Sequence, residues 1–176
     1  MKYIIVLGFL CLCSLLSPVR VNAATTSELV TSYLEADAAD PDIWEICAAA
    51  GEKYGLCPEL LEAIIERESS GNPLATNGEC VGLMQIDAKW HIERMKRLNV
   101  TDLTDPYSNI MVGSDYLSEL FRQAEESGIG ADPYYVLMRY SQRKKSADKQ
   151  WKEGRYSAYA KGICERACEL ERQHGK

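Results

Sequence analysis

The sequence feature that most constrains the fold is a turn-rich segment, SGNPLATNGEC at residues 70–80, which lies between stretches of helical periodicity. Its glycines, asparagines and proline cannot continue a helix, and Asn77-Gly78 is a hairpin-type turn signal. Helices on both sides of so short an interruption predict a mainly α-helical domain. We expect a short turn-rich or β segment near residues 70–86.

Helical patterns account for most of the remaining chain after about residue 41. Apolar residues recur at three- and four-residue steps, Gly55 is a stop signal for the first helix, and Pro58 suits the first turn of the second. The expected helices cover residues 42–54, 58–68, 89–98, 109–124, 134–140 and 157–172.

The first residues read as a targeting segment. Lys2 precedes an apolar run, and Val21-Asn22-Ala23 is a small-residue cleavage pattern, so we interpret residues 1–23 as a signal peptide. An uncleaved anchor is the alternative, but the run is shorter than the roughly 20 residues that cross a bilayer. Residues 24–40 are small, polar and acidic, as in a tether or flexible lead-in, which leaves residues 41–176 as one folded domain.

Composition excludes some partners. Signal cleavage removes Lys2 and Arg20, which takes the formal charge from −6 to −8. An acidic chain is poorly suited to nonspecific nucleic-acid binding, which depends on neutralising phosphates. We expect a secreted, extracytoplasmic monomer with no nucleic-acid partner and no stable membrane insertion after cleavage.

The mature chain keeps five cysteines, and outside the cytoplasm such thiols usually pair. Their spacing does not suggest zinc, so disulfides are favoured over a metal site. A bridge from Cys57 to Cys80 would hold the turn-rich segment against the second helix. Cys164 and Cys168 lie four residues apart on one helix, and either could pair with Cys47, which leaves the pairing open.

Glu68 is distinguished by its position on the second helix. On a helical wheel with Leu60 at zero, the apolar face is centred at about 70° and Glu68 falls at about 80°. Glu62 and Glu66 fall at about 200° and about 240°, the side expected to face water.

A carboxyl on the buried side of a helix's last turn loses hydration and meets the negative end of the helix dipole. Both effects raise its pKa, which suits a general acid that must hold its proton at working pH. The alternative is that the helix end frays and Glu68 turns outward.

Several elements in order resemble the catalytic domain of the family-1 soluble lytic transglycosylases, whose fold is lysozyme-like. They are Glu68-Ser69 with Asn72-Pro73, then the run GLMQI at residues 82–86, then Asn109-Ile110 with Gly113, Tyr116 and Leu117, and finally a late helix that carries Tyr140. The resemblance extends from about Glu45 to the last helix.

The resemblance implies that Glu68 is the single catalytic acid and base. It would protonate the oxygen leaving N-acetylmuramic acid and then deprotonate that sugar's 6-hydroxyl, which closes a 1,6-anhydro ring without water, metal or cofactor. Ordinary glycosidases need a second carboxylate, about 5–9.5 Å away. Asp87 and Glu79 are the acids nearest the motif in sequence, and loop acids are more often solvated than catalytic.

The resemblance also implies a set of substrate contacts. Met84 would supply an apolar contact, and Gln85 would hydrogen bond to an acetamido group. Tyr140 would lie near the catalytic carboxyl, and Ser69 and Ser141 complete the expected substrate-binding set. Ser141 departs from the family, which has asparagine there, so the contact made at this position is in doubt.

Two further features have alternative interpretations. The basic run 143–149 is most simply a solvated surface, although it could contact carboxylates of the stem peptide. Trp90 could stack on a sugar ring or could anchor a helix start by packing, and His91 has no partner that suggests a nucleophilic triad.

The function that we expect is a lytic transglycosylase acting on peptidoglycan glycan strands. A muramidase that hydrolyses the same bond with water is the nearest alternative. A non-catalytic glycan-binding module is the alternative from another class, motivated by Ser141.

Overall fold

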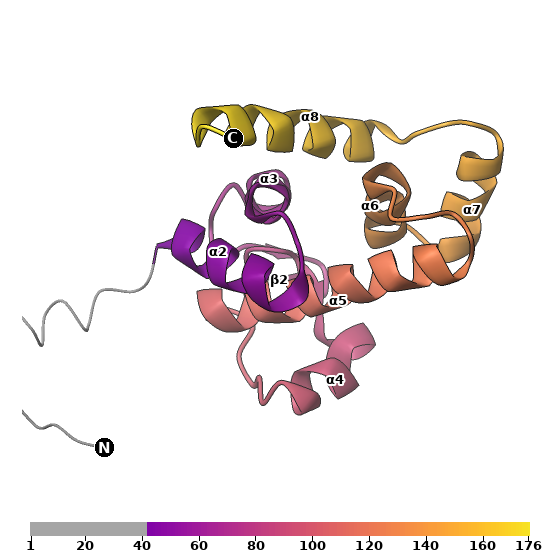
Figure 1. Ribbon diagram of the computed structural model, residues 1–176. Coiled ribbons are helices and arrows are strands. Elements are labelled where there is room, and N and C mark those ends of the chain that lie inside the picture. The colour runs from indigo at the N-terminus through magenta and orange to yellow at the C-terminus, as the bar shows by residue number, and fades with distance from the viewer. Residues whose placement is uncertain (1–41) are drawn as a thin grey trace, which may run out of the picture. The chain divides into compact units, whose positions relative to one another are not determined.

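The protein is described by a computed structural model in which residues 42–176 are defined (Figure 1). The expected signal peptide, 1–23, and lead-in, 24–40, lie outside the described residues. Among the helices of residues 42–176, none is long and apolar enough to cross a membrane.

The described part is mainly helical, as the sequence predicted, and the expected helices are all present. Gly55 ends the first in a left-handed conformation, with φ 67°. Asp105, Asp132 and Ser157 each accept a hydrogen bond from a backbone N–H in the first turn of the helix that follows. The helices are α2 (Ile43–Tyr54), α3 (Pro58–Ser69), α4 (Ala88–Arg97), α5 (Pro106–Glu126), α6 (Pro133–Ser141), α7 (Lys144–Lys152) and α8 (Ala158–Gln173).

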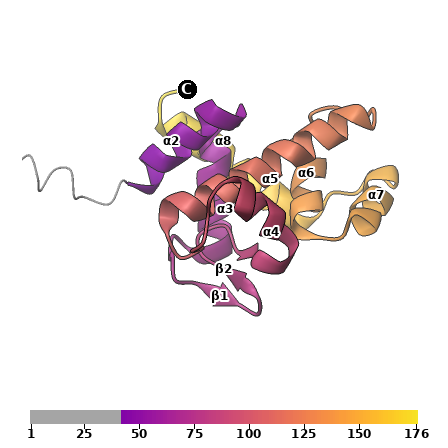
Figure 2. The ribbon, with the colours of Figure 1, turned by 90° about the horizontal axis from the view of Figure 1, so that it is seen from below.

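A small antiparallel sheet occupies the turn-rich segment, which confirms the expected β excursion. Its strands are β1 (Thr76–Asn77), β2 (Cys80–Val81) and β3 (Ile86–Asp87), in the order β1-β2-β3. Figure 2 shows β1 and β2 projecting at one edge of the helical body. Gly78 has a φ of +63° in the turn between them, a conformation that glycine adopts without strain.

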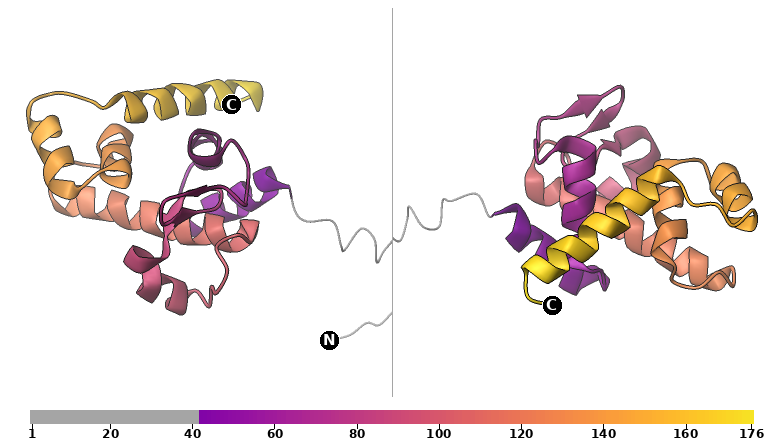
Figure 3. Two further views of the ribbon diagram at one scale, coloured as in Figure 1. Left: turned by 180° about the vertical axis from the view of Figure 1, so that it is seen from behind. Right: turned by 90° about the horizontal axis from the view of Figure 1, so that it is seen from above.

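Helix α3 lies inside the helical body and carries the predicted apolar face. It packs against both α2 and α8, and Figure 3 shows α8 crossing over it. Leu60, Leu61, Ile64 and Ile65 are buried, and Glu66 is exposed, as predicted. Glu62 does not face water: it is half-buried, and burial raises its pKa. The wheel treated the helix alone, whereas α8 packs on α3.

A buried glutamate ties the C-terminus to the start of α3. Glu59 has no exposed surface, and Lys176 Nζ and His174 Nδ1 lie 2.8 Å and 3.1 Å from its Oε1. Cys57 Sγ donates to Oε2 at 3.1 Å. Burial raises the pKa of Glu59, but these hydrogen bonds outweigh that effect and hold the pKa at about 2. The carboxylate therefore stays charged and fastens the end of α8.

Helix α7 is the element that the sequence did not predict. The basic run 143–149, interpreted as solvated surface, contains the start of this helix. Ala147 is its only buried residue, and Trp151 packs edge-on against Tyr135, with ring centroids 5.4 Å apart. Only Ala147 and Trp151 anchor α7 to the rest of the domain in this way, so its sequence lacks the repeated apolar positions by which a helix is recognised.

Candidate active site

The Glu68 carboxyl lies at the end of α3 and is covered by α8. The side chain is half-buried, and its Oε1 accepts a hydrogen bond from the Tyr159 hydroxyl at 2.5 Å. Burial raises the pKa of Glu68 more than the Tyr159 hydrogen bond and the Arg67 charge lower it. The result is a carboxyl that holds its proton to higher pH than an exposed one.

Tyr159 is the site residue that sequence reasoning missed. It lies in the first turn of α8, and burial together with the charge of Glu68 raises the pKa of its hydroxyl. The hydroxyl therefore stays protonated and donates to the carboxylate. One sequence signal indicates that Tyr159 is buried: Tyr159 and Ile163 are four residues apart and therefore share a helix face. Nothing in the sequence shows that this face packs against α3.

Ser69 follows Glu68, and its hydroxyl is already used. Its Oγ donates to the Ile65 carbonyl oxygen at 3.1 Å. Ser70 then ends the helix with a φ of 54°, and its N–H donates to the Glu66 carbonyl. These contacts fix the backbone that carries Glu68, and they engage the Ser69 hydroxyl within the protein.

The GLMQI run forms a loop and strand that Asn109 of α5 anchors. Asn109 is fully buried, and its Nδ2 donates to the carbonyl oxygens of Val81 and Leu103 at 2.9 and 2.8 Å. Its Oδ1 accepts from the Met84 N–H at 2.8 Å. Gly82 has a φ of +79°, and a Cβ there would lie 2.2 Å from Asn109 Nδ2. Glycine and asparagine are therefore required as a pair.

Met84 differs from the expectation that its side chain contacts sugar. The side chain has no exposed surface and packs against α5 at Gly113, where a Cβ would lie 2.4 Å from its Sδ. Its carbonyl oxygen accepts from the Tyr140 hydroxyl at 2.8 Å. In this structure Met84 belongs to the core, because the small residue on α5 makes room for it.

Gln85 is half-buried and has a left-handed backbone, with φ 49°. Its Nε2 donates to the carbonyl oxygens of Gly82 and Ala75 at 2.9 and 3.1 Å. The amide N–H groups are thus engaged within the protein, which leaves the side-chain oxygen to accept a hydrogen bond from a ligand.

Tyr140 lies near Glu68 but does not hydrogen bond to it. Burial raises its pKa well above the usual value, and the charges of Glu68 and Tyr116 add to the effect. The Tyr140 hydroxyl donates to the Met84 carbonyl oxygen, and the direct hydrogen bond to the Glu68 carboxyl comes from Tyr159. Ser141 Oγ donates to the Leu137 carbonyl at 3.0 Å.

A groove of about 930 Å³ lies between α4 and α6, with α5 at its base. Glu68 is not among the side chains that line the groove, but its charge raises the pKa of Cys80 and Tyr140, which line it, so Glu68 lies near this end of the groove. The side chains that line the groove are Cys80, Gln85, Ile86, Asp87, Trp90, His91, Ile92, Glu93, Arg94, Arg97, Tyr116, Glu119, Arg139, Tyr140, Ser141, Gln142 and Arg143.

Neither acid near the motif in sequence is among the groups that shift the pKa of Glu68. Asp87 caps α4, its Oδ1 accepting from the Lys89 N–H at 2.9 Å. Glu79 is exposed and lies 3.0 Å from Lys89 Nζ. The groups that shift the pKa of Glu68 are Tyr159 and Arg67, and no carboxylate is among them.

The cysteines do not form the expected disulfides: all five in the described residues are unpaired. The predicted Cys57–Cys80 bridge is absent, and Cys57 Sγ instead donates to Glu59 and Glu171. Burial raises the pKa of Cys57 to about 11 and that of Cys47 to about 12, so both stay protonated. The expectation came from composition and compartment, whereas pairing requires matched Cβ geometry.

The chain is similar to a known family over most of the described part. Residues 45–163 match the family described as "Transglycosylase SLT domain". The match begins in α2 and ends in α8, so it contains Glu68, Tyr159 and the residues that line the groove.

Curated relatives bear related names. The chain is 40% identical over 77 residues to the "Transglycosylase" of Enterobacteria phage PRD1, which covers 43% of this chain and 28% of that protein. It is 36% identical over 84 residues to "Membrane-bound lytic murein transglycosylase E" of Buchnera aphidicola, a match that covers 43% of this chain and 38% of that protein. It is 35% identical over 104 residues to "Endo-type membrane-bound lytic murein transglycosylase A" of Klebsiella pneumoniae, a match that covers 54% of this chain and 49% of that protein. The matched region is thus less than half the length of each relative.

Proposed function

Because the chain belongs to the transglycosylase SLT domain family, of the lysozyme-like superfamily, we propose that it is a peptidoglycan lytic transglycosylase. It cleaves the β-1,4 bond between N-acetylmuramic acid and N-acetylglucosamine. The observation that carries the proposal is the Glu68 carboxyl, which lies near the Cys80 and Tyr140 end of a groove and whose pKa is raised by burial.

Glu68 acts first as the acid and then as the base. Its proton passes to the glycosidic oxygen as the bond from C1 of N-acetylmuramic acid to that oxygen breaks. The 6-hydroxyl of the same sugar then bonds to C1 and returns its proton to the carboxylate. The products are a free 4-hydroxyl on one fragment and a 1,6-anhydro end on the other, and water is not consumed.

The surroundings of Glu68 support a mechanism with one carboxyl. Hydrolytic glycosidases use two, the second serving as nucleophile or as base for water. The charged group that affects Glu68 in the described structure is Arg67, and the hydrogen-bond donor is Tyr159. An internal hydroxyl that replaces water needs no second base, because the Glu68 carboxylate is free once it has given up its proton.

The groove supplies the sugar contacts. The side-chain oxygen of Gln85 accepts from an acetamido N–H, and Ser141 and Tyr140 lie along the same groove. Ser69 positions the end of α3 through its bond to Ile65. Met84 takes part through its backbone, which Tyr140 holds, rather than through its side chain.

The place of action is outside the cytoplasm, where the substrate is. Residues 1–23 direct export and are removed after Ala23, and residues 24–40 connect to the catalytic domain. Mass measurement of protein recovered from the culture medium tests this directly: a chain beginning at Ala24 is expected, and an intact N-terminus in the medium would contradict cleavage.

Mass spectrometry of digested cell wall tests the reaction. Fragments with anhydro ends are lighter by one water than fragments with reducing ends, so the expected products lie at the lower mass. Reducing ends alone would show a muramidase and would refute the transglycosylase mechanism.

A matched pair of variants tests the residue. Glu68→Gln keeps the shape but cannot exchange a proton, so we expect a loss of wall cleavage of at least about a hundredfold. Glu66→Gln changes an exposed glutamate on the same helix and should keep activity. Full activity in Glu68→Gln would refute the role of Glu68, and an inactive parent protein would indicate a binding module.

A further inference from the structure

Trp90 is the most exposed large hydrophobic side chain in the described part of the protein, at 84%. It lies near the start of α4 and lines the groove. Of the two sequence interpretations, packing at a helix start is therefore excluded. Large exposed aromatic rings in a groove are characteristic of binding sites, because their contact energy is realised only with a ligand.

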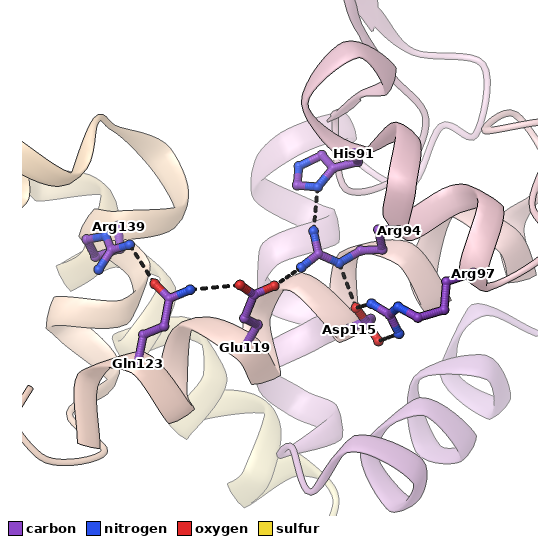
Figure 4. Close-up of polar contacts among 7 residues, drawn as sticks. All are labelled: His91, Arg94, Arg97, Asp115, Glu119, Gln123 and Arg139. Atoms are coloured by element: carbon purple, nitrogen blue, oxygen red, sulfur yellow. Dashed lines mark hydrogen bonds and ion pairs between the residues drawn. The ribbon is translucent and has the colours of Figure 1, made fainter. Parts of the chain in front are cut away.

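Ion pairs to α5 help to hold helix α4, the helix that carries Trp90. The helix has no buried residue. Arg94, only 9% exposed, pairs with Asp115 at 2.6 Å and also with Glu119, both on α5. Arg97 pairs with Asp115 at 2.7 Å. Figure 4 shows both arginines of α4 converging on the acids of α5.

The same network reaches the opposite wall of the groove. Gln123 Nε2 donates to Glu119 at 2.7 Å, and Arg139 of α6 donates to Gln123 Oε1 at 3.0 Å (Figure 4). A continuous set of side chains thus connects α4, α5 and α6. The two walls are joined by charged and polar contacts, so their separation is set by the fold.

Aromatic rings lead from α4 toward Glu68. His91 Nδ1 accepts a hydrogen bond from Arg94 Nη1 at 2.7 Å, and its ring packs at a tilt against Tyr116, with ring centroids 4.6 Å apart. Tyr116 in turn lies 5.5 Å from Tyr140, whose pKa is raised in part by the charge of Glu68. His91 is therefore part of the wall, and the groove is continuous from the catalytic end to Trp90.

We propose that Trp90 is a stacking platform for a pyranose ring of the glycan strand, at a subsite beyond the bond that is cleaved. The C–H bonds on one face of a pyranose carry partial positive charge and meet the negative face of an indole. Asp87 and Arg97 also line the groove, and carboxylate and guanidinium groups can hydrogen bond to sugar hydroxyls. The inference rests on the proposed function, since it assumes a glycan strand in the groove.

A sugar fits these observations better than a membrane does. Insertion into lipid needs a broad apolar face, whereas Trp90 and Ile92 are accompanied in the groove by four arginines and by acids. A polymer that leaves the Glu68 end of this groove would meet Trp90.

Binding to the Glu68→Gln protein tests the platform without turnover. With soluble, peptide-free glycan strands as the probe, we expect Trp90→Ala in this background to raise Kd about tenfold. Trp90→Phe keeps a stacking face and should lose less than about threefold. Tyr107→Ala removes another exposed aromatic that does not line the groove and should leave Kd unchanged.

Three outcomes overturn the inference. One is an unchanged Kd in Trp90→Ala, and another is an equal loss in Tyr107→Ala. The third is loss of binding to vesicles of anionic phospholipid by Trp90→Ala with glycan affinity kept, which would assign the side chain to a lipid surface. Because Kd is measured directly, failure of Trp90 remains distinguishable from failure of Glu68, whose test is product formation.

Discussion

Replacing Tyr159 by phenylalanine tests how the structure sets the proton affinity of Glu68. The substitution removes the hydroxyl that donates to Glu68 Oε1 and keeps the ring that covers the carboxyl. The lost hydrogen bond stabilised the charged carboxylate, so the pKa of Glu68 must rise further. A general acid works only while protonated, and its activity is lost as pH rises through its pKa. The alkaline limb of the pH profile should therefore move upward.

The size of the change follows from the strength of one hydrogen bond to a charged group. Such bonds contribute about 1.5–3 kcal/mol, and one pKa unit corresponds to about 1.4 kcal/mol, which gives about one to two pH units. Glu68 is only partly buried, and solvent can replace part of the lost hydrogen bond. We therefore expect the lower end, about one pH unit.

The assay is the initial rate of wall clearance from pH 4 to pH 9, with the anhydro products measured in parallel. Tyr156→Phe is the control, since Tyr156 lies three residues away and packs against Tyr134 and Trp151 rather than Glu68. An alkaline limb that stays in place or moves downward in Tyr159→Phe would refute the reasoning, as would an equal shift in Tyr156→Phe.

Two stability measurements examine the same site. Glu68→Gln should raise the melting temperature by a few degrees at pH 7 and leave it unchanged near pH 3, as measured by scanning calorimetry. The reason is that a carboxyl whose pKa is raised on folding destabilises the protein only above its unfolded pKa. An equal gain in melting temperature at both pH values would contradict this. Asn109→Ala leaves one buried N–H and two carbonyl oxygens without their partner, so urea denaturation should show that the free energy of unfolding falls by at least about 3 kcal/mol. The control Thr101→Ala, at an exposed position, should lower it by less than about 0.5 kcal/mol. A fall below about 1 kcal/mol in Asn109→Ala would refute the anchoring role.

The parts of the fold that depend on local pattern could be predicted from the sequence. Gly55 and Pro58 set helix boundaries where the structure has them, and Asn77-Gly78 marked a real hairpin. Helix α7 could not be found in this way, because Ala147 and Trp151 attach it through single contacts rather than through an apolar period.

The candidate site likewise contains residues that local pattern predicts and residues that only tertiary packing places. Glu68 was identified from its own helix, whereas Tyr159 reaches it from 91 residues away and depends on how two helices cross. Met84 was expected in the groove, but the space left by Gly113 receives its side chain. Contacts between distant segments follow from packing, which no local pattern encodes.

Glu68 and Tyr159 are 91 residues apart in the chain, so Tyr159 is synthesised well after the helix that carries Glu68. Helix α8 follows the other helices of the domain in the chain, and Lys176 can pair with Glu59 only after α8 has been synthesised. Under the proposed function, a nascent or partly translocated chain holds the acid without its hydroxyl partner and without the cover that raises its pKa. Under the same proposal, the site is complete only after α8 has been synthesised and has packed on α3.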